Sequence, residues 1–138
     1  MASYVYTFTD STGKYGVRFT ISQTNNEEAN TSTISITKFE VLTPGYNSFI
    51  LDGSLYIGNT RIWYSSAYEG TYTGWCNTWS DQGVTNATTV TVNHADDGSL
   101  NLTLTLKNYG SDYTKGFLFM NYNTTGADAW ITNGTTST

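Results

Sequence analysis

Charged side chains, cysteine, histidine and proline are all scarce in this chain of 138 residues. Only 12% of the residues are charged, and Cys, His and Pro occur once each. A single Cys excludes an internal disulfide framework and a cysteine-rich zinc site, and a single His excludes a multi-histidine metal centre. The six Lys and Arg are scattered, whereas a nucleic-acid-binding protein shows a basic patch. We therefore expect no metal, no cofactor and no nucleic-acid partner.

Long hydrophobic runs are also missing. No apolar segment approaches the roughly 20 residues that span a bilayer. The first residues, Met1–Val5, have neither the basic nor the apolar segment of a secretory signal. The net charge of −5 disfavours direct contact with DNA. The sequence therefore predicts a chain without a membrane partner.

Threonine and aromatic residues are abundant. The chain holds 26 Thr, 13 Ser and 13 Asn, and 15% of its residues are aromatic, including 11 Tyr and 4 Trp. Disordered chains lack aromatic residues. Abundant Thr and Tyr with little charge are typical of an all-β protein whose exposed strand faces carry hydroxyl side chains.

Apolar residues alternate with polar ones along most of the chain, which indicates half-buried strands. The clearest case is Leu100–Leu106, where four Leu alternate with Asn and Thr; similar patterns occupy Val17–Ile21, Ile34–Val41 and Val90–Val92. The expected strands lie near 3–9, 15–23, 32–42, 48–57, 60–67, 71–79, 87–94, 99–107, 115–123 and 128–133.

Turn signals separate these strands. Asp52-Gly53 and Gly58-Asn59 indicate tight turns, and Asp97-Gly98 gives the strongest hairpin signal. Eight to ten short strands with frequent turns favour an all-β fold, an antiparallel β-sandwich of immunoglobulin-like or jelly-roll type. We expect a single domain over residues 1–133 and a C-terminal tail over 134–138.

Two stretches resemble β-sandwich modules in structural (tail or virion) proteins of tailed bacteriophages. Thr20–Gln23 and Ala29–Ile36 resemble the "ISQ…NNTSTVTV" opening of those modules, and Thr89–Leu100 resembles their "TVTHNADGSKS" hairpin with its H-x-x-D-G-S spacing. Between them, Asp52–Tyr56 resembles a "DG-x-x-Y" strand start. Together these segments cover roughly residues 17–107.

This resemblance implies a non-enzymatic virion structural protein displayed on the phage particle. Its partners would be other capsid or tail subunits, and it would be oligomeric in the assembly. A capsid decoration or auxiliary role and a tail-associated role both fit, and decoration is slightly favoured because no second domain anchors the chain in a tail.

A dense aromatic stretch supplies the candidate contact residues. It includes Trp63, Tyr64, Tyr72, Trp75 and Trp79. Facing inward, these rings would form core; facing outward, they would suit a neighbouring subunit or a sugar ring. The alternative function is therefore a carbohydrate-binding adhesion module, lectin-like, recognising host or mucosal glycans. A third hypothesis, a bacterial adhesin or pilus subunit, is disfavoured by the absent signal peptide.

The loop around Asp97 clusters one His with two carboxylates. A structural role in the turn explains it better than a metal or catalytic one, because Gly tolerates positive φ and Asp and Ser side chains bond nearby amides. The residues of this expected structural hairpin are His94, Asp96, Asp97, Gly98 and Ser99.

No catalytic residue is predicted. Cys76 has no basic neighbour in the sequence and is expected to be a buried thiol. The carboxylate pairs Glu27-Glu28 and Glu69 with Asp81 are weak candidates for glycoside hydrolysis, because nothing in the sequence places either pair in catalytic geometry.

Overall fold

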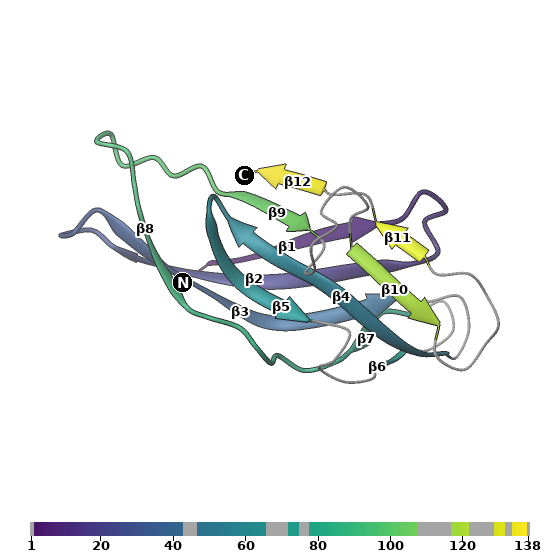
Figure 1. Cartoon of the computed structure of the whole chain (residues 1–138). Coiled ribbons are helices and arrows are strands. Elements are labelled where there is room, and N and C mark those ends of the chain that lie inside the picture. The colour runs from purple at the N-terminus through teal and green to yellow at the C-terminus, as the bar shows by residue number, and fades with distance from the viewer. Residues whose placement is uncertain are drawn as a thin grey trace.

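Two antiparallel β-sheets pack together as a β-sandwich in the computed structural model (Figure 1). The structure describes residues 2–42, 47–65, 72–74, 78–107, 117–121, 129–131 and 134–137. Within this part the all-β, antiparallel sandwich predicted from the alternation is confirmed, and no helix is long and apolar enough to cross a membrane. The strands are β1 (Ala2–Thr9), β2 (Gly16–Asn26), β3 (Thr31–Leu42), β4 (Asn47–Ile57), β5 (Thr60–Ser65), β6 (Tyr72–Gly74), β7 (Ser80–Asp81), β8 (Val90–Asn93), β9 (Thr103–Lys107), β10 (Phe117–Asn121), β11 (Ala129–Ile131) and β12 (Gly134–Ser137).

The first sheet is a meander of the three N-terminal strands. Its order is β1-β2-β3, and the outer edge of β3 is paired with β7 at one end and with β8 at the other. The β2–β3 hairpin is long, because its pairing continues from Gly16 and Leu42 out to Asn26 and Thr31. This hairpin carries the residues of the first resemblance motif to one end of the molecule.

The second sheet is organised around β4. Along this strand Asn47–Phe49 pair with β6 and Phe49–Asp52 with β10. Gly53–Ile57 pair with β5 on one side, and Ser54–Ile57 pair with β9 on the other. The sheet continues from β10 to β11 and from β9 to β12. The periodicity of the sequence leaves the order of the strands undetermined, and the structure supplies it.

The core lies between the inner faces of the two sheets. Trp63 is at its centre, with ring centroids 5.0 Å from Phe19 and 4.8 Å from Phe39. Aromatic pairs at this separation add stability beyond the burial of their area. The other core residues are Tyr6, Phe8, Val17, Ile21, Ile34, Ile36, Val41, Leu55, Ile57, Ile62, Leu102, Leu104 and Leu106.

Two β-bulges explain breaks in the alternation. In β3 the buried residues change from Ile36 to Phe39, a spacing of three, and the pairing with β2 shifts register there. In β5 the adjacent residues Ile62 and Trp63 are both buried, and the pairing with β4 shifts register beside them. An inserted residue rotates the strand so that both sides of the bulge keep their apolar residues in the core.

The observed elements correct three expectations. Asp52 and Gly53 lie inside β4 where it changes partners, so they form no turn; a Gly within a strand often marks such an irregularity. Residues Gly134–Ser137, expected as a tail, form β12 and pair with β9. Of the expected strand 71–79, Tyr72–Gly74 form β6 and Trp79 lies outside the strands, whereas 71 and 75–77 are outside the described residues; β7 begins at Ser80.

A fourth correction concerns the hairpin expected at Asp97-Gly98. The turn is present, but β8 pairs with β3 in the first sheet, and β9 pairs with β4 and β12 in the second. The turn therefore lies in a crossover between sheets. Alternation reports which face of a strand is buried and carries no information about its neighbour, and the nine residues from His94 to Leu102 are long enough to cross between layers.

Candidate functional site

Two turns meet at one end of the sandwich and form the candidate functional site. One is the turn over 27–30 that joins β2 to β3, and the other is the turn over 95–99 that follows β8. Both project from the same end of the molecule (Figure 1). The two turns meet in space although they lie more than sixty positions apart in the chain.

Backbone and amide contacts clamp the two turns together. The His94 amide donates to the Asn30 carbonyl at 2.9 Å, and Asn30 Nδ2 donates to the Ala95 carbonyl at 2.9 Å. Asn30 has φ of 54°, a left-handed conformation that Asn tolerates better than most residues. The side chain of this single turn residue thus reaches across to the crossover.

The His94 ring joins both turns. Its Nδ1 donates to the Gly98 carbonyl at 2.8 Å, and its Nε2 lies 2.6 Å from Ser32 Oγ. Ser32 Oγ in turn donates to Asn25 Oδ1 at 2.7 Å, and Gln23 Nε2 donates to both of these oxygens. Ser32 Oγ is therefore the centre of a polar network that joins His94, Asn25 and Gln23.

The turn after β8 is also held from within. The Gly98 amide donates to the Ala95 carbonyl at 2.8 Å, and Gly98 has φ of 86°, which favours glycine. One carboxylate oxygen of Asp97 accepts from the Ser99 hydroxyl at 2.6 Å and from the Ser99 amide at 2.9 Å. These two bonds, the hydroxyl foremost, hold the pKa of Asp97 below its ordinary value. Asp97 is thereby engaged in the turn itself.

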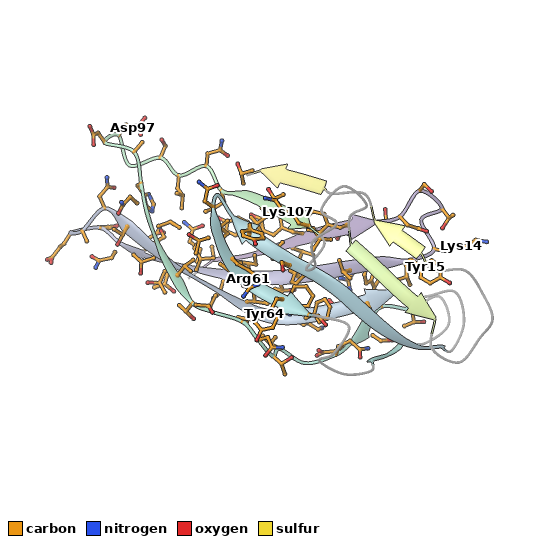
Figure 2. The ribbon with its side chains drawn as sticks, viewed as in Figure 1. Lys14, Tyr15, Arg61, Tyr64, Asp97 and Lys107 are labelled. Carbon is orange, nitrogen blue, oxygen red and sulfur yellow. The ribbon has the colours of Figure 1, made fainter. Side chains whose placement is uncertain are left out.

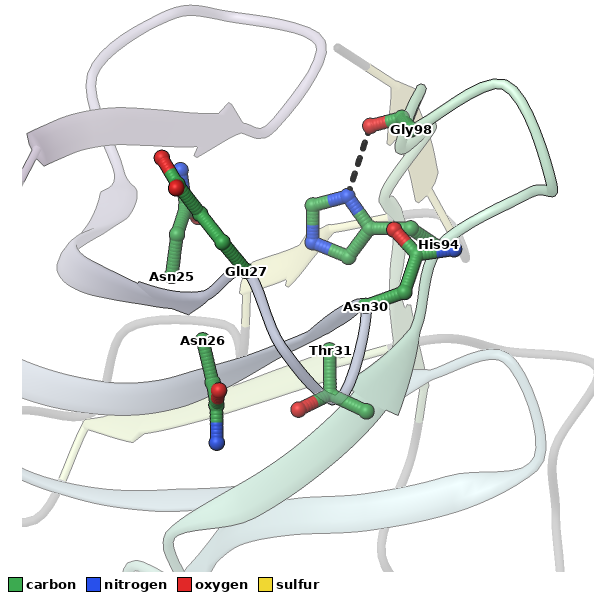
Figure 3. Close-up of a pocket in the computed structure, with 7 residues that line it drawn as sticks. All are labelled: Asn25, Asn26, Glu27, Asn30, Thr31, His94 and Gly98. Carbon is green, nitrogen blue, oxygen red and sulfur yellow. Dashed lines mark hydrogen bonds between the residues drawn. The ribbon is translucent and has the colours of Figure 1, made fainter.

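A polar cleft of about 260 Å³ lies between the two turns (Figure 3). Its lining residues share a polar character and come from both turns and the end of the β2–β3 hairpin. They are Asn25, Asn26, Glu27, Asn30, Thr31, His94 and Gly98. These lining residues include no Lys or Arg, and their only aromatic ring is the imidazole of His94. The cleft therefore presents amide groups and one carboxylate to a ligand.

The donor set does not suit a metal. Among the described residues no three His, Cys, Asp or Glu side chains gather in a way that could hold a metal ion. Both ring nitrogens of His94 already contact protein atoms, so neither is available as a ligand or a general base. Of the weak carboxylate candidates, Glu27 lines the cleft and Asp81 lies in β7, whereas Glu69 is outside the described residues.

Three of the five aromatic residues predicted as contacts have described side chains, and these three, Trp63, Tyr64 and Trp79, do not gather. Trp63 is 1% exposed and packs in the core, so its prediction as a contact residue is wrong: the bulge in β5 turns it inward. Tyr64, the next residue, lies on the outer face of the second sheet with Arg61 4.6 Å from its ring (Figure 2). Tyr72 lies in β6, but its side chain is outside the description, as are Trp75 and Cys76.

Trp79 belongs to a cluster on the outer face of the first sheet that sequence reasoning missed. The Arg18 guanidinium lies 4.4 Å from the Trp79 ring and makes two bonds to Glu40, from Nε at 2.9 Å and from Nη2 at 2.7 Å. A Cβ added at Gly16 would come 2.8 Å from the Trp79 ring, so the glycine makes room for the indole. Trp79 and Tyr64 therefore occupy opposite layers of the sandwich.

Glu40 is the one described carboxylate buried in a sheet face. It is 6% exposed, and its hydrogen bonds to Arg18, followed by the charges of Arg18 and Lys38, hold its pKa below 4.5. The cross-strand register Arg18↔Glu40 follows from the β2–β3 pairing. The sequence signal for this ion pair is the opposite charge of Arg18 and Glu40 on two expected strands. Periodicity alone does not show that these strands are neighbours.

Comparison of the chain with protein-family models, with curated proteins and with solved structures gives no match.

Proposed function

We propose that the chain is a non-enzymatic structural protein of a bacteriophage virion, displayed on the particle surface. In this role it is a capsid decoration or auxiliary protein, or a tail-associated β-sandwich. Its partners are neighbouring capsid or tail subunits, and it contacts neither nucleic acid nor membrane. Its mechanism is surface complementarity, in which a rigid sandwich buries part of its surface against other subunits.

The observation that carries the proposal is the meeting of the two stretches that resemble phage modules. The resemblance rests on Ala29–Ile36 and Thr89–Leu100, and these segments pair as β3 and β8. Their junction is fixed by contacts of His94 with Asn30 and Ser32. Because the two segments are hydrogen-bonded to each other, there is a physical reason for the two motifs to occur in the same sequence. This supports treating the two motifs as a single resemblance.

The edge strand β1 supports an assembly role. Among the described residues no strand pairs with its outer edge, and its eight residues include neither a charge nor a proline. Its pairing with β2 is regular over all eight positions, and Tyr4 and Val5 are 39% and 60% exposed. Natural edge strands are usually protected by charges, prolines or bulges. A strand without them suits pairing with a second subunit.

Immunogold labelling of purified phage particles, with an antibody raised against this chain, tests the proposal. Antibody pre-adsorbed with the recombinant chain is the control. We expect specific label on the particle: label spread over the head identifies a decoration protein, and label confined to the tail identifies a tail-associated module. Absence of specific label, together with absence of the chain from the particle's protein gel, would overturn the proposal.

A further inference from the structure

We propose that the cleft between the β2–β3 turn and the turn after β8 binds one uncharged saccharide ring through its hydroxyl groups. This site differs from the aromatic surface predicted from the sequence. It also does not depend on where the chain is located, because a free chain and a particle-bound chain would both carry it. The proposal rests on the cleft's rigidity, on the polar groups that its walls leave unused, and on the ligand classes that its charge excludes.

The cleft is built before any ligand arrives. Asn30 and His94 join its two walls through their backbone atoms, and the His94 ring fixes the turn at Gly98 (Figure 3). On the other wall, Asn25 is held by Ser32, whose side chain is fully buried. A preorganised site loses little conformational entropy on binding, which matters for a small ligand with few contacts.

Two polar groups on the same side of the hairpin as the His94 ring have no protein partner among the described residues (Figure 3). Asn25 Oδ1 accepts two bonds, but the Asn25 Nδ2 group is unused. The Glu27 carboxylate also has no protein bond. The cleft thus offers an amide donor and a charged acceptor.

This mixture matches sugar hydroxyls, each of which donates one hydrogen bond and accepts others. A carboxylate accepts from one hydroxyl while a neighbouring amide donates to the next. At about 260 Å³ the cleft is smaller than the roughly 300–1,000 Å³ of sites for drug-sized ligands. It therefore suits one ring, such as the terminal residue of a glycan, with the rest of the chain in solvent.

Charge and shape exclude other ligand classes. Neither the segment 24–31 nor the segment 94–99 contains Lys or Arg, and together they contain four carboxylates, so an anion such as sulfate or phosphate is disfavoured. A nucleobase would need a stacking platform that the lining residues lack. An uncharged polyhydroxy ligand is the class that remains.

The test is a titration of the ¹⁵N-labelled chain with glucose, galactose, mannose and N-acetylglucosamine, each followed by amide chemical shifts. Glycerol, calcium and sulfate are titrated separately as controls. We expect at least one sugar to give saturable shifts at millimolar concentration, confined to the amides of 25–31 and 94–99. Glycerol should give no saturable shifts there at the same concentrations.

Matched variants assign the site. Glu27→Gln should weaken the sugar affinity about tenfold, as expected for loss of one charge-assisted hydrogen bond. Glu28→Gln alters the same turn outside the cleft and should leave the affinity unchanged.

Several outcomes would overturn the proposal. These are no saturable shift with any sugar, shifts that map to Tyr64 or Trp79 instead, and an equal loss of affinity in Glu27→Gln and Glu28→Gln. Equal saturation by glycerol would show that the cleft does not recognise a ring. Saturation by calcium or sulfate alone, in place of the sugars, would assign the cleft to an ion.

Discussion

Ser32 and His94 lie 62 positions apart in the chain, and their side chains meet at 2.6 Å between Oγ and Nε2. Ser32 is fully buried beyond the end of the apolar core, at a point where the β2–β3 hairpin would otherwise expose its inner face. The crossover after β8 covers that face. The pair therefore fixes the end of the sandwich where β3 pairs with β8 and where the cleft lies.

Replacing His94 with Ala should loosen this end. The change removes the ring contacts to Ser32 and Gly98, and the loss of two hydrogen bonds costs about 1–3 kcal/mol of unfolding free energy. Urea denaturation measures the loss, and amide hydrogen exchange should increase over 95–99. Asp96→Ala alters an exposed residue of the same turn and should stay within about 0.5 kcal/mol of the parent. Equal effects of the two variants would contradict the clamp.

The fold was largely predictable because the inner faces of the strands are mostly apolar. Leu102, Leu104 and Leu106 are all buried, as their alternation predicts. The partners of these strands were not predictable, since a period of two identifies a face and leaves the neighbour open. For this reason the sequence predicts the Asp97-Gly98 turn at the correct place but in a hairpin. In the structure the turn lies in a crossover between the two sheets.

The candidate site was less predictable than the fold. Trp63 and Tyr64 are adjacent aromatic residues, and only the bulge beside Ile62 decides which of them faces the core. The cleft draws on Glu27 and His94, which are distant in the sequence and belong to separate strand pairs. No local pattern brings such residues together, because the long-range pairing of β3 with β8 does so.

Neutralising Glu40 should destabilise the protein in a pH-dependent way. Because the folded state lowers the pKa of Glu40, its carboxylate contributes stability above pH 4.5, and this contribution is lost as the pH falls through the folded value. Glu40→Gln should therefore cost about 1–3 kcal/mol at pH 7. The difference from the parent should shrink as the pH falls below 4.5.

Denaturation curves of the parent and Glu40→Gln, recorded from pH 7 down to pH 3, check this prediction. Glu28→Gln, an exposed change in the β2–β3 turn, is the control and should change stability little at any pH. A difference between parent and Glu40→Gln that stays constant over the whole range would contradict a role for the ionised carboxylate beside Arg18.

A lysine at Val5 should weaken self-association if β1 pairs with a second copy. The edge of β1 carries no charge, and a lysine there introduces the protection that natural edge strands use. Sedimentation equilibrium over a range of concentrations measures the effect. Val84→Lys changes another exposed valine that lies outside the strands and should not alter association. A parent chain that stays monomeric at every concentration would count against β1 as a contact between copies.

The adjacent aromatic residues of β5 give a direct test of core placement. Trp63→Ala should cost about 3–5 kcal/mol, since it empties the centre of the aromatic cluster with Phe19 and Phe39. Tyr64→Ala, one position away on the outer face, should cost much less. Guanidinium denaturation of both variants compares them. A larger effect at Tyr64 than at Trp63 would reverse the assignment of faces in β5.

Tyr6 offers a change that should stabilise the protein. Its hydroxyl is buried and has no hydrogen-bond partner within the part of the chain that the structure describes. A buried, unsatisfied hydroxyl costs about 1–3 kcal/mol, so Tyr6→Phe should raise the unfolding free energy by about 1 kcal/mol. Tyr4→Phe removes the same group from an exposed position on the same strand and should be close to neutral. Thermal and urea denaturation of the two variants make the comparison, and a loss of stability in Tyr6→Phe would show that this hydroxyl is bonded in the folded protein.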